Sequence, residues 1–155
     1  MEPDGAALRP ASGGAYRPRV LVADDEEPIL RLLEMKFVRA GFDVVTAIDG
    51  RQAWEKVLQQ PFDLVLTDYR MADIDGLELC GKLLMHPRTR HIPVLVMTSP
   101  WCKIGDQLQQ FDNVVELIEK PLDVRELIAK VRRLVAAAPP ARSGPASSGA
   151  AEGQG

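Results

Sequence analysis

The sequence predicts a doubly wound α/β domain built on a five-stranded parallel sheet. Short apolar runs of strand length alternate five times with amphipathic stretches of helical spacing. This alternation is typical of a parallel sheet covered by helices on both faces and connected by right-handed crossovers. The chain has 155 residues, 46% of them hydrophobic, which is enough for one such domain but not comfortably for two.

The first part of the alternation predicts three strands and two helices. Strands are expected at 19–23, 42–47 and 62–67, because each segment contains a short apolar run and is bounded by turn residues. The first helix begins near Pro28, which a first helical turn tolerates, and ends at Gly41, whereas the second begins at Asp49-Gly50 and ends before Pro61. Their expected core-facing residues are Ile29, Leu32, Leu33 and Phe37, then Ala53, Trp54, Val57 and Leu58.

The second part predicts two more strands, at 93–97 and 114–118, and three helices. Residues 76–85 form a helix in this interpretation, and 103–111 form a weaker one with only two good apolar anchors. The expected core-facing residues are Leu77, Cys80, Gly81 and Leu84, then Leu108 and Phe111, and finally Val124, Leu127, Ile128, Val131 and Leu134 of a last helix.

Composition indicates the bounds of this domain and the cellular compartment in which it is expected. Segments 1–18 and 139–155 are rich in Gly, Pro, Ala and Ser without apolar periodicity, so we expect them to be disordered around a domain at 19–138. No apolar run approaches the about 18 residues of a membrane span, and the N-terminus lacks the apolar stretch of a signal peptide. The net charge of −3 argues against a broad basic surface for nucleic acid. Cys80 and Cys102 are too few for a disulfide framework, so a cytoplasmic protein with free thiols is expected.

Polar residues gather directly after four of the predicted strands. They are Asp24, Asp25 and Glu26 after the first strand, Asp68 after the third, Thr98 and Ser99 after the fourth, and Lys120 after the fifth. In a parallel sheet these positions share the carboxyl edge, where open α/β folds bind ligands. A flavodoxin-like strand order, 2-1-3-4-5, has its switch point between strands one and three, which would bring the three aspartates together.

Such a group of residues has the parts that phosphoryl transfer needs. Crowded carboxylates repel one another and are relieved by raised pKa values or by a divalent cation, and oxygen-only ligands favour Mg²⁺. Asp68 supplies a nucleophile, Lys120 a compact positive charge and Thr98 a hydroxyl donor. Each residue alone has a simpler reading, since an acidic pair can cap a helix and a lysine before proline is usually solvated. The coincidence at four strand ends favours a phosphoacceptor site centred on Asp68.

With these residues in place, the chain resembles a response-regulator receiver domain, the phosphoacceptor module of two-component signalling. The resemblance covers about 19–136. Its motifs are Val20-Leu-Val-Ala-Asp-Asp-Glu26, Asp63-Leu-Val-Leu-Thr-Asp-Tyr-Arg-Met71 with Asp75-Gly76, Ile92-Pro-Val-Leu-Val-Met-Thr98, and Glu119-Lys-Pro121. Any one of them is weak alone, and together they are specific.

The resemblance implies a role for each matching residue. Asp68 would take a phosphoryl group from the phosphohistidine of a sensor histidine kinase or a histidine phosphotransfer protein. Asp25 and Asp68 would bind Mg²⁺ directly with the backbone carbonyl of Arg70, and Asp24 would act largely through water. Beyond its own phosphorylation and autodephosphorylation, such a domain is not an enzyme.

The phosphoryl group itself would be contacted by Thr98 and Lys120 in the resemblance. Arg70 and Pro100, two positions beyond Asp68 and Thr98, would border the path of the water that hydrolyses the aspartyl phosphate. Leu117 stands at the switch position, where many receivers carry Tyr or Phe, so the resemblance does not extend to the aromatic residue of the usual relay.

Two further departures lie close to the site. Ala72 replaces the usual proline after Met71, so the loop after Asp68 is expected to be less stiff. Trp101 belongs to an unusual bulky stretch after Thr98, and we expect it to pack under the weak helix rather than to cover the pocket.

With only the tail after the last helix, we expect a stand-alone receiver that signals by binding an unknown downstream protein. The expected surface is the fourth helix, fifth strand and fifth helix, in a monomer or a phosphorylation-dependent dimer, with no nucleic-acid or membrane partner. Two alternatives stay open: a degenerate receiver that is only a protein-binding scaffold, and a phosphohydrolase of the haloacid dehalogenase type. The latter normally carries its nucleophile after the first strand and needs a cap domain, for which this chain has no room.

Overall fold

The computed structural model describes residues 16–137 and has a parallel sheet of five strands in the order β3-β2-β4-β5-β6. This order confirms the predicted 2-1-3-4-5 arrangement. The elements, in chain order, are β2 (Arg19–Ala23), α1 (Glu27–Arg39), β3 (Asp43–Ala47), α2 (Gly50–Gln59), β4 (Leu64–Asp68), α3 (Gly76–Met85), β5 (Val94–Thr98), α4 (Gly105–Leu108), β6 (Val114–Glu119) and α5 (Val124–Ala136). Of the segments 1–18 and 139–155, which we expect to be disordered, only residues 16–18 are described, and there the carbonyl of Pro18 accepts a hydrogen bond of 2.9 Å from the N–H of Asp43.

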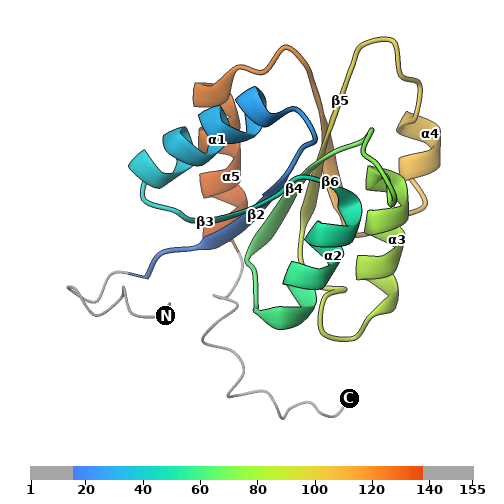
Figure 1. Cartoon of the computed structure of the whole chain (residues 1–155). Helices are drawn as coiled ribbons and strands as arrows, with labels where there is room; N and C mark the ends of the chain where they lie inside the picture. The colour runs from blue at the N-terminus through green and yellow to red at the C-terminus, as the bar shows by residue number, and fades with distance from the viewer. Residues whose placement is uncertain (1–15, 138–155) are drawn as a thin grey trace.

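The helices cover both faces of the sheet, with α1 and α5 on one side and α2, α3 and α4 on the other (Figure 1). Each face has its own hydrophobic cluster because successive strand side chains point to opposite faces. In β2, Val20 and Val22 join the cluster under α1 and α5, while Leu21 and Ala23 join the other. The three inner strands β2, β4 and β5 are buried along their whole length, and this two-sided burial explains why most of their residues are apolar.

Two helices bury a different set of residues from the predicted one. In α1, Leu30 lies in the core, whereas Leu32 is 40% exposed. In α3, Leu79 and Leu83 are fully buried, while Leu77 and Leu84 are only half-buried. The α3 sequence is apolar on more than one side, so its pattern offers two candidate faces, and packing against the sheet selects one.

Helix α4 is a single turn of four residues rather than the helix predicted over 103–111. The N-cap residue before it, Ile104, makes no side-chain hydrogen bond to the helix, and the residues that follow are mostly polar. Leu108 and the unpredicted Ile104 are both 4% exposed and anchor the turn, with Phe111 half-buried beside them. Few apolar contacts hold this segment, which explains the short helix.

The loop between β4 and α3 is held in place by two glycines. A Cβ on Gly50, at the start of α2, would lie 1.8 Å from the carbonyl oxygen of Ile74. A Cβ on Gly76, at the start of α3, would lie 2.6 Å from the carbonyl oxygen of Asp68. Asp75 begins α3 with a reciprocal capping box. The loop that follows Asp68 is therefore fixed by backbone contacts at both ends.

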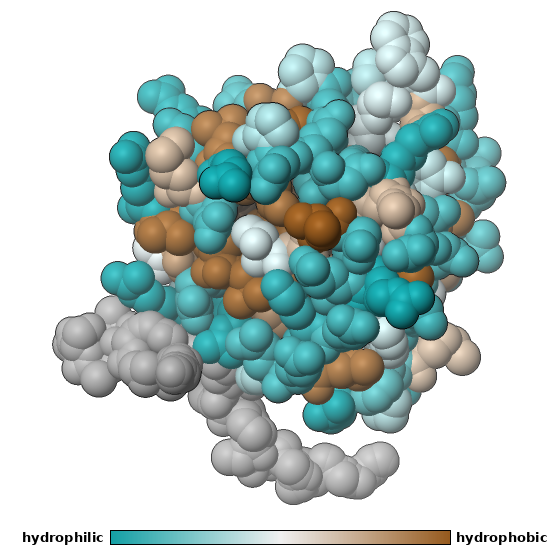
Figure 2. All heavy atoms as spheres, in the orientation of Figure 1, coloured by the Kyte–Doolittle hydropathy of each residue, from teal (hydrophilic) through white to brown (hydrophobic). Residues whose placement is uncertain are grey.

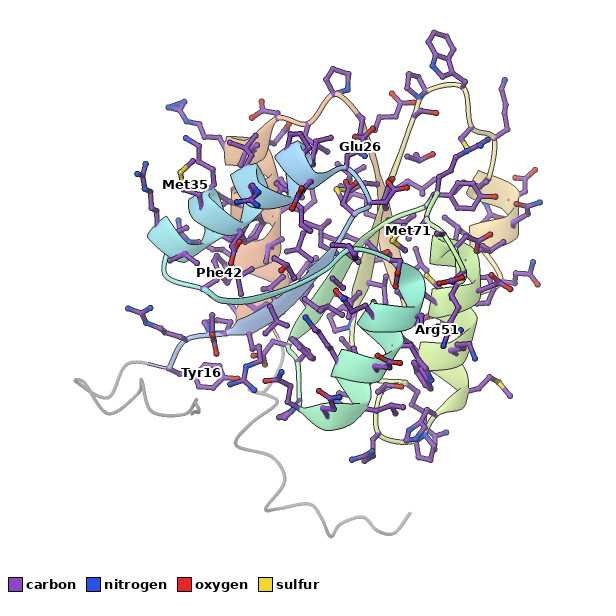
Figure 3. All side chains as sticks on the ribbon, in the orientation of Figure 1. Tyr16, Glu26, Met35, Phe42, Arg51 and Met71 are labelled. Atoms are coloured by element: carbon purple, nitrogen blue, oxygen red, sulfur yellow. The ribbon has the colours of Figure 1, made fainter. Side chains whose placement is uncertain are left out.

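The surface is mostly hydrophilic on the face shown in Figure 2, and hydrophobic residues gather over the edge strand β3 in the middle of that view. In Figure 3, Glu26 and Met71 lie near one end of the sheet, and Tyr16 lies at the other. Among residues 16–137, no helix is long and apolar enough to cross a membrane.

Candidate phosphoacceptor site

The site lies at the carboxyl edge of the sheet, and the strand register brings its residues together. Ala23 of β2 pairs with Thr67 of β4, so Asp24 and Asp68 each stand one residue beyond a matched pair. At the other side of β4, Asp68 pairs with Met97 of β5, directly before Thr98. Lys120 follows β6, whose Glu119 pairs with Thr98. The four strand ends that carry polar residues in the sequence thus meet in one place.

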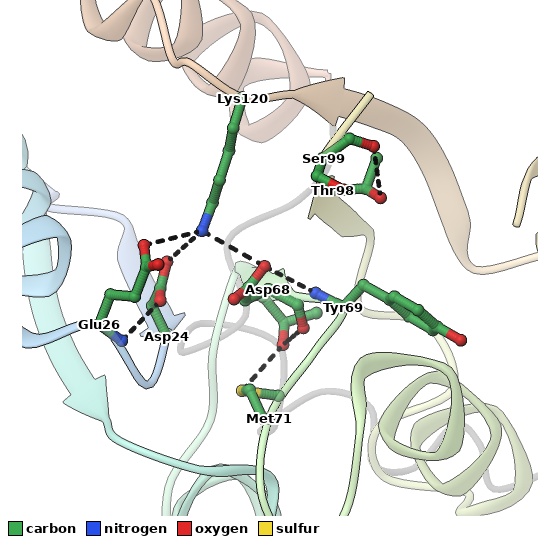
Figure 4. A network of polar contacts seen from close by, with 9 residues as sticks. Asp24, Glu26, Asp68, Tyr69, Met71, Thr98, Ser99 and Lys120 are labelled. Atoms are coloured by element: carbon green, nitrogen blue, oxygen red, sulfur yellow. Dashed lines mark hydrogen bonds and ion pairs between the residues drawn. The ribbon is translucent and has the colours of Figure 1, made fainter. Parts of the chain in front are cut away.

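Lys120 is the centre of the polar network (Figure 4). Its Nζ lies 3.1 Å from Asp24 Oδ2, 3.4 Å from Asp68 Oδ1 and 3.6 Å from Glu26 Oε1. Asp24 is completely buried, and its other oxygen accepts a hydrogen bond of 2.9 Å from the backbone N–H of Glu26. Asp68 Oδ1 accepts a hydrogen bond of 3.0 Å from the backbone N–H of Tyr69. The ammonium group thus offsets part of a concentrated negative charge.

Three carboxylates at this edge of the sheet form a set suited to a cation. Asp24, Asp25 and Asp68 each offer one oxygen, and these oxygens lie within 4.8 Å of one another. Asp25 is exposed and the other two are buried, so the set opens to solvent on one side. Oxygen-only donors with a high negative charge are what Mg²⁺ prefers. The residues present therefore fit the predicted metal.

Burial makes ionisation of Asp24 and Asp68 less favourable. Burial, followed by the charge of Asp24, raises the pKa of Asp68 to about 6, and Lys120 offsets only part of this effect. Burial also raises the pKa of Asp24. For Lys120 burial lowers the pKa, but the hydrogen bond to Asp24 and the charges of Asp68 and Asp24 outweigh it, so that the pKa is raised overall. The lysine therefore stays protonated beside the carboxylates.

An open pocket lies over Asp68. Its lining residues are Asp25, Glu26, Asp68, Tyr69, Arg70, Thr98, Ser99, Cys102 and Lys120. Thr98 is buried, and its hydroxyl donates a hydrogen bond of 3.3 Å to the carbonyl of Ser99. Arg70 borders the pocket as expected. Pro100 is exposed and, among the described residues, is not part of the lining, whereas Cys102 is.

Trp101 and Leu117 complete the set of residues singled out in the sequence. Trp101 is 83% exposed, so the prediction that it packs under the weak helix is wrong. Leu117 is half-buried and packs against the cluster under α2, α3 and α4. A Cβ on Gly105 would lie 3.9 Å from Leu117 Cδ1, which places this side chain beside the start of α4. Its part in a switch stays a prediction.

Comparison with known proteins agrees with this geometry. The model of the response regulator receiver domain family matches residues 20–132. The chain is 36% identical over 119 residues to the DNA-binding dual master transcriptional regulator RpaA of Synechocystis, a match that covers 76% of this chain and 49% of that protein. It is 38% identical over 117 residues to the response regulator PleD of Caulobacter vibrioides, a match that covers 75% of this chain and 26% of that protein. The chain therefore spans about half and about a quarter of these relatives.

A solved structure shows the same fold. The receiver domain of a sensor histidine kinase from Pseudomonas aeruginosa, described with a magnesium ion coordinated in its active-site cleft, has a TM-score of 0.70 at 22% identity, covering 78% of this chain and 99% of that one. The family match and the site at the carboxyl edge together show that this chain belongs to the response regulator receiver domains, which are the phosphoacceptors of two-component systems.

Proposed function

We propose that this chain accepts a phosphoryl group on Asp68 from a histidine kinase or a histidine phosphotransfer protein, in a reaction that depends on Mg²⁺. The observation that carries the proposal is the position of Lys120 Nζ, 3.1 Å from Asp24 and 3.4 Å from Asp68, beside three carboxylates with mutually close oxygens. Residues that only cap a helix or form a surface ion pair do not need to be buried, as Asp24 and Asp68 are, and do not need to come from four converging strand ends.

The metal would be held by Asp25 and Asp68, with the backbone carbonyl of Arg70, while Asp24 acts largely through water. When bound, Mg²⁺ neutralises charge and orients phosphoryl oxygens. The family match and the carboxylate set support this assignment, as does the magnesium described in the structurally similar receiver from Pseudomonas aeruginosa.

The protein's own groups have distinct tasks in the transfer. A carboxylate oxygen of Asp68 attacks phosphorus as the phosphorus–nitrogen bond of the donor phosphohistidine breaks, and the electron pair of that bond stays on the imidazole. Lys120 neutralises charge on a phosphoryl oxygen, and the Thr98 hydroxyl turns from the Ser99 carbonyl to donate to another. Hydrolysis of the aspartyl phosphate then returns the site to its starting state.

Signalling would occur through a change in which protein the domain binds. We assign this role to the surface of α4, β6 and α5, because α4 is a single turn with few anchors and suits a mobile element. The domain would occupy 19–138 and act as a monomer or as a phosphorylation-dependent dimer. The two free thiols fit a reducing, cytoplasmic setting.

The test is labelling with acetyl phosphate and Mg²⁺, followed on a phosphate-affinity gel. Wild type and the control Asp112→Asn, which changes an exposed carboxylate, should shift, and Asp68→Asn should not. Omission of Mg²⁺ should abolish the shift of wild type and of Asp112→Asn. A folded wild type that never shifts would make a degenerate, scaffold-only receiver the better assignment.

A pull-down would then identify the downstream partner. Wild type and Asp68→Asn are each compared with and without beryllofluoride and Mg²⁺. We expect a protein that binds only wild type in the presence of beryllofluoride. Equal capture in all four samples would contradict phosphorylation-dependent binding.

A further inference from the structure

The chain turns back on itself directly after the acceptor-site threonine. The backbone N–H of Cys102 donates a hydrogen bond of 3.1 Å to the carbonyl of Ser99, which closes a four-residue turn. Pro100 occupies the second position of this turn, which suits the fixed φ of proline. The two central residues, Pro100 and Trp101, are consequently directed outward, and both are exposed.

The fourth residue of the turn returns to the pocket. Cys102 is half-buried and lines the pocket that contains Asp68, Tyr69 and Arg70. It also packs against the hydrophobic cluster that includes Ile104, so its side chain is supported from behind. A residue held between the core and an open pocket has little freedom to leave it.

We propose that Cys102, in place of Pro100, borders the path of the water that hydrolyses phosphorylated Asp68, and so sets the lifetime of the signal. This inference rests on the proposed function. In the step concerned, the water oxygen bonds to phosphorus as the bond between phosphorus and the Asp68 oxygen breaks. The electron pair of that bond remains on the carboxylate, and the proton released from water passes to solvent.

The chemistry of a thiol predicts whether a substitution at position 102 speeds or slows hydrolysis of the aspartyl phosphate. A thiol is a weak hydrogen-bond donor and acceptor and behaves much like a small apolar group. It therefore does little to orient a water molecule, and it leaves room for one to approach. A hydroxyl at the same place would hold a water more firmly, and a larger apolar side chain would exclude it.

The experiment measures how long the aspartyl phosphate survives in position 102 variants. Wild type, Cys102→Ser and Cys102→Leu are labelled with acetyl phosphate and Mg²⁺, the donor is removed, and the loss of label is followed on a phosphate-affinity gel. We expect serine to shorten the half-life and leucine to lengthen it, each by roughly threefold or more. Pro100→Ala and Trp101→Ala change the same turn at its outward positions and should stay within about twofold of wild type.

Alkylation of the thiol by a small neutral reagent gives a second readout that does not depend on hydrolysis. Cys102 should react, and Mg²⁺ with beryllofluoride should slow its reaction in wild type but not in Asp68→Asn. Cys80 is the internal control, because it is fully buried and burial raises its pKa to about 12. Protection of Cys102 would place its thiol beside the occupied acceptor site.

The outcomes separate this inference from the proposal on which it depends. A wild type that takes no label would overturn the proposed function, and the role of Cys102 with it. A wild type that takes the label normally, but whose half-life responds to Pro100 and not to Cys102, would overturn the role of Cys102 alone. Unprotected Cys102 in a labelled protein would do the same.

Discussion

Replacing Asp68 by asparagine removes one negative charge from the carboxyl edge of the sheet and keeps the size of the side chain. Burial and the neighbouring Asp24 raise the pKa of Asp68 from 3.8 to about 6 in the folded protein. Folding thus makes ionisation of this carboxyl less favourable. The substitution should stabilise the metal-free protein at neutral pH, although it removes the acceptor.

The size of the effect follows from the pKa of Asp68. A shift of about 2 pKa units corresponds to roughly 3 kcal/mol. Because the folded-state pKa is raised, the stabilisation associated with this group is complete below about pH 4 and is lost as the pH rises through about 6. The screening typical of protein sites reduces the figure, so we expect Asp68→Asn to raise the free energy of unfolding by about 1–3 kcal/mol at pH 7.5.

The assay is urea unfolding of both proteins between pH 4 and 8 in the presence of a chelator. The two midpoints should lie close together at the acid end and separate as Asp68 ionises, at constant m-value. Repeating the series with Mg²⁺ should narrow or reverse the difference in midpoint between the two proteins, because a cation that binds only the folded wild type stabilises it. The stabilisation is about 2.7 kcal/mol when the Mg²⁺ concentration is a hundred times its Kd. Asp112→Asn, an exposed carboxylate, should stay within about 0.5 kcal/mol of wild type throughout.

Two results would refute this reasoning. One is an asparagine variant that is no more stable than wild type at pH 7.5 without metal. The other is a stability difference that does not change with pH, which would mean that the variant acts through packing and not through the charge of Asp68.

Three other substitutions test the contacts around the site. Gly76→Ala brings a Cβ against the carbonyl of Asp68 and should destabilise the fold by about 1–3 kcal/mol in urea melts, with weaker Mg²⁺ binding by calorimetry. Lys120→Met leaves the buried Asp24 without its cation and should cost about 3–5 kcal/mol at pH 7.5, but less at pH 5; an equal loss at both would contradict the ion-pair account. Asp75→Ala removes the capping box of α3 and should lower thermal stability by about 1 kcal/mol, and an unchanged Tm would show that the cap contributes nothing.

The fold could be predicted from the sequence wherever a single pattern dominated. Strand β2 and helix α3 have the predicted bounds, because strand-length apolar runs and capping residues mark them without ambiguity. The buried face of α3 was predicted wrongly because leucines surround that helix, and only packing against the sheet decides which of them are covered. The length of α4 depended likewise on tertiary contacts of Ile104 and Leu108 rather than on helical spacing.

The acceptor site followed from sequence because a parallel sheet places successive strand ends at one edge. That rule fixes the neighbourhood of Asp24, Asp68 and Lys120 without knowledge of any loop. It does not fix the direction of side chains in the loops, so Trp101 was expected inside and lies outside. The Ser-Pro sequence before Trp101 favours a turn, and that signal would have indicated that Trp101 occupies an exposed position.

The contact between Gly50 and Ile74 has a consequence for protein engineering. The start of α2 and the loop after Asp68 come from different crossovers, yet a single methyl group at position 50 would collide with the backbone of that loop. The two segments therefore have to be transplanted as one piece if this acceptor loop is grafted onto another receiver. A chimaera that takes the loop and keeps a larger residue at the position of Gly50 should misplace its acceptor aspartate, even with every ligand present.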